Sequence, residues 1–115
     1  MRVRRQGGTG IDVSGVVIDA TDLDLLARFW SSLLGLDITR REDDWISLGP
    51  QLALQRVAEP KTGKNRVHLD LVADDFTAAT ARAAELGASA QGGLRENLWQ
   101  VWQDPEGNEF CICRS

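Results

Sequence analysis

The sequence predicts a single small α+β domain built from two copies of a β-α-β-β-β module, whose strands form a half-open curved sheet. Segments rich in β-branched or alternating apolar residues open each half of the chain, at 11–20 and 66–73, and a helical pattern follows each of them. The two helical segments, Asp22–Gly35 and Asp74–Gly87, have equal lengths and are offset by 52 residues. A repeat of this size indicates two equivalent modules, neither of which buries its sheet alone.

The first module is expected over about residues 11–57. The helix over 22–35 begins at Thr21 or Asp22, either of which can cap it, and ends at Gly35, which suits a left-handed backbone. Its apolar stripe consists of Leu25, Leu26, Phe29, Trp30, Leu33 and Leu34. Three extended segments follow at 36–41, 45–48 and 51–57, and the charged run 40–44 is interpreted as a solvated hairpin.

The second module is expected over about residues 66–114. Strand alternation places Val67, Leu69 and Leu71 on one face and His68, Asp70 and Val72 on the other. The helix over 74–87 turns Phe76, Ala79, Ala83 and Leu86 inward. Extended segments follow at 88–91, 97–103 and 109–113, with the Pro- and Gly-containing sequence 104–108 as a turn.

Length and charge exclude several classes of protein. A chain of 115 residues holds one domain, here expected over 11–115 after a flexible basic tail at 1–10. No apolar run approaches the roughly 20 residues that a membrane span needs, and no export signal follows the tail. The net charge of −4 has the wrong sign for a nucleic-acid surface. We expect a cytoplasmic protein with Cys111 and Cys113 reduced.

Three stretches together resemble one superfamily: GVVIDATDLDLLARFWSSLLGL (15–36), VHLDLVADD (67–75) and WQDPEGNEFCIC (102–113). They are similar to the glyoxalase, bleomycin-resistance and extradiol-dioxygenase proteins, which have the vicinal-oxygen-chelate fold, and more narrowly to the small glyoxalase-like domain proteins of actinobacteria. The resemblance covers residues 11–114. It implies two βαβββ modules that form a half-open barrel around a substrate cavity.

The resemblance also implies a divalent metal held by one residue from each of four strands. Those positions fall at Gly15, Gln55, His68 and Cys111, and metal-binding members carry Glu at the last of them. Only His68 is a standard ligand, so the sequence predicts no complete family metal site and no cofactor. The alternative is a divalent metal, such as zinc held by His68 and Cys111 with Asp70 nearby.

The ligand pocket is predicted to be lined by Gln55, His68, Asp70, Trp99, Trp102 and Cys111. His68 is the candidate acid or base, with Asp70 orienting its ring, and the alternative is a solvated pair without a catalytic role. Trp99 and Trp102 differ in strand parity, so at least one of them should face the groove. Packing between modules or across a dimer explains these tryptophans equally well.

The sequence thus favours a domain that binds a small aromatic or hydrophobic molecule in the cavity of its curved sheet. The second hypothesis is a lyase, isomerase or dioxygenase that uses a metal or His68 as acid or base. The third is a dimeric interaction domain with a vestigial cavity. We expect a homodimer whose partner is a small molecule, with neither nucleic acid nor membrane involved.

Overall fold

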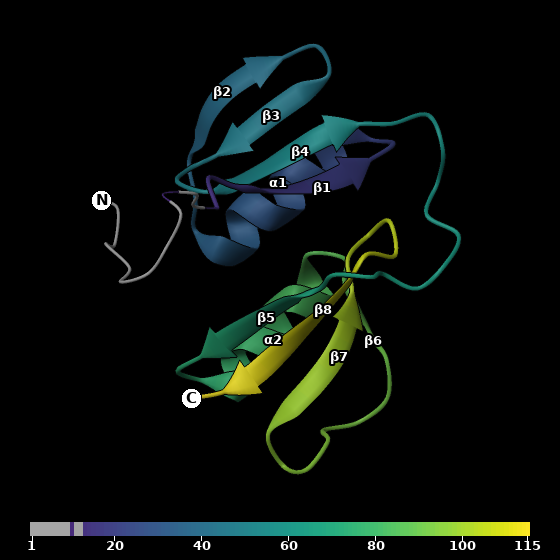
Figure 1. The fold of residues 1–115 in the computed structure, drawn as a ribbon. Coiled ribbons are helices and arrows are strands. Elements are labelled where there is room, and N and C mark those ends of the chain that lie inside the picture. Colours follow the sequence, from purple (N-terminus) through teal and green to yellow (C-terminus); the bar gives the residue numbers. More distant parts are fainter. Residues whose placement is uncertain (1–9, 11–12) are drawn as a thin grey trace.

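Two four-stranded sheets, each with one helix, make up the protein in a computed structural model that describes residues 10 and 13–115 (Figure 1). The first module contains β1 (Val16–Ala20), α1 (Leu23–Leu34), β2 (Ile38–Glu42), β3 (Trp45–Leu48) and β4 (Leu52–Arg56). The second contains β5 (Leu69–Ala73), α2 (Phe76–Glu85), β6 (Ser89–Ala90), β7 (Trp99–Gln103) and β8 (Glu109–Arg114). The predicted α+β class and the repeated β-α-β-β-β order are confirmed. The predicted tail lies outside the described residues, apart from Gly10.

The duplication extends to the connections within each sheet. The strand orders are β1-β4-β3-β2 and β5-β8-β7-β6, so corresponding strands occupy corresponding places. In each module the first strand pairs in parallel with the last, and the remaining pairs are antiparallel. A parallel pair cannot be closed by a tight turn, so each module needs its intervening helix and hairpin. Each sheet has one face that no helix covers, and the two sheets do not close into a barrel.

Both helices begin in the same way. The carboxylate of Asp22 accepts a hydrogen bond from the Leu25 amide at 3.0 Å, and the carboxylate of Asp75 accepts one from the Ala78 amide at 3.0 Å. Asp22, rather than Thr21, therefore caps α1, and each cap satisfies an amide that has no partner within the helix. Neither helix in the described part of the chain is long and apolar enough to cross a membrane.

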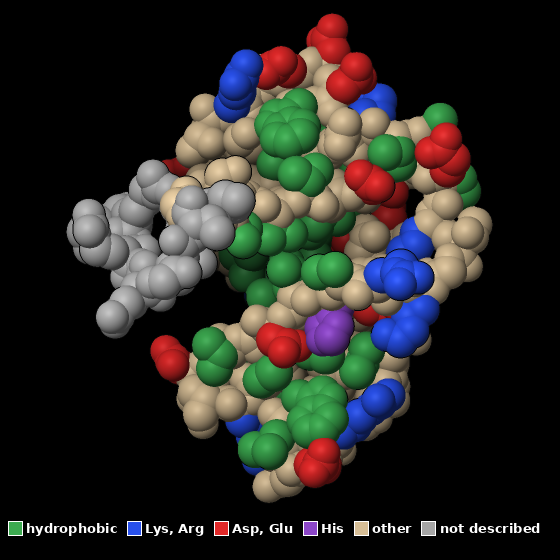
Figure 2. All heavy atoms as spheres, in the orientation of Figure 1, with side chains coloured by type: hydrophobic (Ala, Val, Ile, Leu, Met, Phe, Trp, Pro, Cys, Tyr) green, Lys and Arg blue, Asp and Glu red, His purple; other side chains and the backbone are tan. Residues whose placement is uncertain are grey.

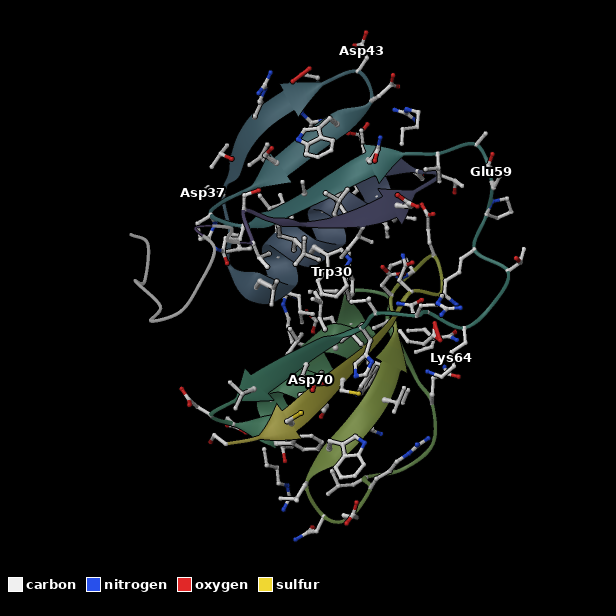
Figure 3. The ribbon with its side chains drawn as sticks, in the orientation of Figure 1. Trp30, Asp37, Asp43, Glu59, Lys64 and Asp70 are labelled. Atoms are coloured by element: carbon white, nitrogen blue, oxygen red, sulfur yellow. The ribbon has the colours of Figure 1, made fainter. Side chains whose placement is uncertain are left out.

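An aromatic cluster joins the two modules. Trp30 on α1 is 1% exposed, and its ring lies 5.1 Å from that of Phe29 and 5.0 Å from that of Phe110 on β8, centroid to centroid. These edge-to-face arrangements are favourable for aromatic rings. Figure 3 shows Trp30 between the modules, as expected for a core residue. The cluster couples the first helix to the last strand.

The turn between β7 and β8 adds a polar connection at the same place. Asp104, 3% exposed, accepts a hydrogen bond from Trp30 Nε1 at 3.1 Å and from the backbone amides of Glu106 and Asn108 at 2.9 and 3.0 Å. The same carboxylate also accepts from the Asn108 side chain. One buried carboxylate therefore shapes the turn and fixes the indole of the other module.

Glu106 in the same turn binds the start of α1. Its carboxylate accepts hydrogen bonds from the backbone amides of Thr21 at 2.7 Å and Asp22 at 2.6 Å, and from the Thr21 hydroxyl at 2.9 Å. A carboxylate at a helix N-terminus is favoured by the amide dipoles there. The segment 104–108 was predicted only as a turn. The structure shows that its carboxylates also connect the second module to the first through hydrogen bonds.

Replacing Asp104 with Ala should lower the free energy of unfolding by about 3 kcal/mol, because it leaves buried donors, including the Trp30 indole, without an acceptor. Urea unfolding followed by far-UV circular dichroism measures the change. Asp43→Ala, in the exposed β2–β3 turn, is the control and should change stability by less than about 0.5 kcal/mol. Equal effects of the two substitutions would contradict the role assigned to Asp104.

Candidate functional site

The open face of the second sheet carries the candidate site. Register places Asp70 of β5 opposite Cys111 of β8, and Val72 opposite Cys113. Trp99 of β7 lies opposite Cys113 on the other side of β8. Residues directly paired across strands share a sheet face. These side chains therefore lie together on the face away from α2, while the alternate residues pack toward the helix.

A groove with a volume of about 520 Å³ lies along this face. One wall is apolar and consists of Leu98, which is exposed, and Trp99, which is half-buried. The remaining lining residues are His68, Asp70, Cys111, Cys113 and Arg114. Figure 2 shows the histidine in purple beside an acidic side chain, with an apolar patch below them.

Three of the predicted site residues form a compact polar cluster within the groove. His68 Nε2 lies 3.1 Å from Asp70 Oδ1. The ligand-type atoms of His68, Asp70 and Cys111 all lie within 4.8 Å of one another. His68 and Asp70 are exposed and Cys111 is buried, so the thiol lies at the base of the cluster. Figure 3 marks Asp70 on the open side of β5.

The environment of Cys111 keeps its thiol protonated. Burial raises the pKa of Cys111, and the negative charge of Asp70 raises it further. Burial also raises the pKa of Cys113, again with a contribution from Asp70. Both cysteines are free. Since the thiolate is the nucleophile, neither is activated for attack at neutral pH by these surroundings.

Trp102, unlike Trp99, does not line this groove. It is 5% exposed and lies in the hydrophobic core on the opposite sheet face from Trp99. Its Nε1 donates to Gln100 Oε1 at 3.1 Å. The parity argument separated the two tryptophans correctly, but it did not show that only Trp99 faces the groove.

Gln55 is also separated from the cluster. It lies on β4 of the first sheet, where its neighbours across the strands are Asp19 and Trp45. It does not line the groove of the second module. Of the six residues predicted to line one pocket, four line this groove: His68, Asp70, Trp99 and Cys111.

A second, smaller hollow of about 190 Å³ lies between the modules. Its walls come from 16–19 in β1, from Trp30, from the segment 65–69, and from Asn108 and Glu109. His68 lines both this hollow and the groove. A hollow therefore lies between the two halves, but most of the predicted polar site residues lie outside it.

Sequence reasoning missed Leu98, Cys113 and Arg114 in the groove, although alternation from Cys111 places Cys113 on the same face. Leu98 immediately precedes Trp99, but β7 begins only at Trp99, so strand alternation does not place it. Arg114 lines the groove near its end; its guanidinium lies 5.4 Å from the centroid of the Phe76 ring and 3.3 Å from Asn97 Oδ1. These contacts depend on loop and helix positions, which the spacing of residues does not reveal.

Two duplicated modules with a polar cluster on an open sheet define the vicinal-oxygen-chelate class, the superfamily of glyoxalases, bleomycin-resistance proteins and extradiol dioxygenases. Residues 15–113 match the family model described as glyoxalase-like domain. The chain belongs to this family. No curated protein matches the sequence.

Solved structures support the fold. A glyoxalase/bleomycin resistance protein/dioxygenase family enzyme from Burkholderia phytofirmans is similar with a TM-score of 0.77 at 19% identity, over 90% of this chain and 98% of that one. Fosfomycin resistance protein FosX from Mesorhizobium loti is similar with a TM-score of 0.73 at 15% identity, over 90% and 92%. Lactoylglutathione lyase from Agrobacterium tumefaciens gives a TM-score of 0.66 at 18% identity, over 90% and 93%.

The residues present do not fit the four-ligand metal centre that the superfamily implies. Gly15 has no side chain, and a Cβ there would lie 3.2 Å from the Gln51 carbonyl oxygen, which is a tight contact. Gln55 offers only a neutral amide oxygen, which is a weak ligand. Cys111 supplies a soft sulfur where the family uses a hard carboxylate oxygen.

Alkylation tests the state of the thiols. We expect iodoacetamide to modify both cysteines slowly at pH 7 and faster as the pH rises toward and above 9.0, because both pKa values are raised above that ordinary value. Cys113, which is less buried, should react before Cys111. Mass spectrometry of Cys111→Ser and Cys113→Ser distinguishes the two sites. Rapid modification of Cys111 at pH 7 would indicate an activated nucleophile instead.

Proposed function

We propose that this protein binds a small, planar, aromatic or hydrophobic molecule carrying one polar group, in the groove of its second module. One observation supports this proposal above the others: the apolar surface of Leu98 and Trp99 adjoins the polar cluster of His68, Asp70 and Cys111 in a single concavity. Small-molecule sites combine a mainly apolar wall with a few polar groups in this way.

The two walls have different roles in binding. The half-buried Trp99 offers a ring on which a planar ligand can stack. Asp70 accepts hydrogen bonds, and His68 donates or accepts according to its tautomer, so together they orient a ligand hydroxyl or amide. A volume of about 520 Å³ suits a ligand of one or two rings. Stacking and hydrogen bonding of this kind need no metal.

An acid–base enzyme is the second candidate, favoured by the 3.1 Å contact between His68 Nε2 and Asp70 Oδ1. With its Nε2–H donated to the carboxylate, the imidazole would present Nδ1 as a proton acceptor. However, both side chains are exposed. Gln55, which was expected to converge on the same substrate, lies on the other sheet. Binding is therefore the function that the site supports better.

Titration with 2-naphthol tests the binding proposal. The metal-free protein, kept in EDTA, should show ¹H–¹⁵N shifts at the Trp99 indole and at Asp70 and Cys111. Trp99→Ala should weaken binding by about tenfold, since an aromatic contact is worth roughly 1 kcal/mol beyond its buried area.

Trp45→Ala is the matched control for that titration. Trp45 begins β3 as Trp99 begins β7, and it too is half-buried on the open face of the first sheet. It should leave the affinity unchanged. Equal losses in the two variants, or shifts confined to the first module, would contradict a site in the second module.

We also propose that the protein forms a homodimer. Exposed apolar side chains support this, among them Val17 on the open face of the first sheet and Val72 on that of the second, 45% and 72% exposed. Light scattering after size-exclusion chromatography should give twice the mass of one chain. Val72→Asp should shift the species toward the monomer, whereas a monomer in the unmodified protein would refute the proposal.

A reducing compartment such as the cytoplasm is consistent with the two free cysteines. Cys111 and Cys113 lie two residues apart on one strand, so their side chains share a face as neighbours along the strand, a poor geometry for bonding to each other.

A further inference from the structure

We propose that His68, Asp70 and Cys111 form a three-ligand site for Zn²⁺ that lies wholly within the second module. The site differs from the superfamily's centre, which takes ligands from both modules and uses oxygen where this chain has sulfur. The inference does not depend on the proposed organic ligand, and it develops the alternative of a zinc ion that the sequence left open.

The backbone of two neighbouring strands positions the three donors. The parallel register of β5 and β8 pairs Asp70 directly with Cys111. His68 comes two residues before Asp70, which places it on the same face at the entry to β5. The histidine at the entry to β5 and the cysteine on β8 come from different strands, but those strands are hydrogen-bonded neighbours, so the two side chains lie close together.

The spacing of the donors fits a tetrahedral ion. Bonds of about 2.0–2.3 Å from zinc to nitrogen, oxygen and sulfur place its ligands roughly 3.5 Å apart. The histidine nitrogen, carboxylate oxygen and sulfur already lie within 4.8 Å of one another. Small rotations of the exposed His68 and Asp70 side chains would close the cluster around an ion, while Cys111 remains at the base.

The donor set selects the metal. An imidazole with a thiolate favours zinc, whereas manganese and magnesium prefer sites made of oxygen. One thiolate and one carboxylate neutralise the double charge of the ion.

Arg114 and Arg95 carry positive charge near the cluster. Arg114 lines the groove, but it is engaged by the Phe76 ring and Asn97. Arg95 lies close enough to lower the pKa of Cys111 slightly, against the larger effects of burial and Asp70.

Three protein ligands leave one coordination position open. The polar cluster lies in the same groove as Leu98 and Trp99, so the open position is available to water or to an oxygen atom of a bound molecule. Zinc sites with three protein ligands and a free position are the chemically active kind, whereas sites with four protein ligands are structural. The structure therefore assigns the second module a zinc site with room for an exogenous ligand.

Cobalt(II) is the probe that tests this site, because it replaces zinc and reports on sulfur ligation. The full-length, reduced protein should bind one equivalent of Co²⁺ and show a sulfur-to-cobalt charge-transfer band in the near ultraviolet, which stoichiometric Zn²⁺ abolishes. Cys111→Ser should remove the band. Cys113→Ser, on the same strand and face, should retain it.

His68→Asn and Asp70→Asn should each weaken Co²⁺ binding by at least about tenfold. Both side chains are exposed, so these variants are expected to fold even if Cys111→Ser does not. Absence of the band in the unmodified protein, loss of the band in Cys113→Ser but not Cys111→Ser, or unchanged affinity in both exposed variants would overturn the proposal. Because the 2-naphthol titration is run in EDTA, failure of either proposal is recognised independently of the other.

Discussion

The structure depends on the contact between Trp30 of the first module and the β7–β8 turn of the second. The two sheets are not hydrogen-bonded to each other in the described part of the chain, so other contacts must hold the modules together. The indole ring packs on Phe110, and its N–H is accepted by the buried Asp104. Glu106 adds hydrogen bonds to the first turn of α1. Separating the modules would expose the buried rings to water and break the hydrogen bond between the indole and the buried carboxylate, so this contact stabilises the pairing of the modules.

The site follows from strand register more than from loop conformation. Asp70 and Cys111 meet because β5 and β8 are parallel neighbours. Trp99 lies opposite Cys113, two residues further along β8, in the antiparallel pairing of β7 with β8. A ligand or an ion in this groove would therefore contact side chains held by main-chain hydrogen bonds. Such sites are more rigid than sites assembled from loops. The duplicated first sheet has a tryptophan in the corresponding place, Trp45, but its neighbour across the strands is Gln55 rather than a cysteine.

The fold was accessible from the sequence because two helical segments of equal length, Asp22–Gly35 and Asp74–Gly87, recur 52 residues apart, although Asp75 rather than Asp74 caps the second helix. The face of the second sheet that carries His68 and Asp70 was also accessible, through alternation along one strand. What alternation cannot supply is the contact between distant segments. From the sequence, it was therefore undecided which of Trp99 and Trp102 faces the groove. Gln55 was grouped with residues of the other sheet, and 104–108 was interpreted as a turn alone. Those outcomes depend on which strands become neighbours and on how the modules pack.

The separation of the two sheets has a mechanical consequence. The hollow near Trp30 takes walls from both modules, so a small rotation of one half against the other would change its shape. The groove beside Trp99 takes all its walls from residues 68–114 and would keep its dimensions during that motion. The shape of the groove thus does not depend on how the two halves are placed relative to each other, whereas the shape of the hollow between them does.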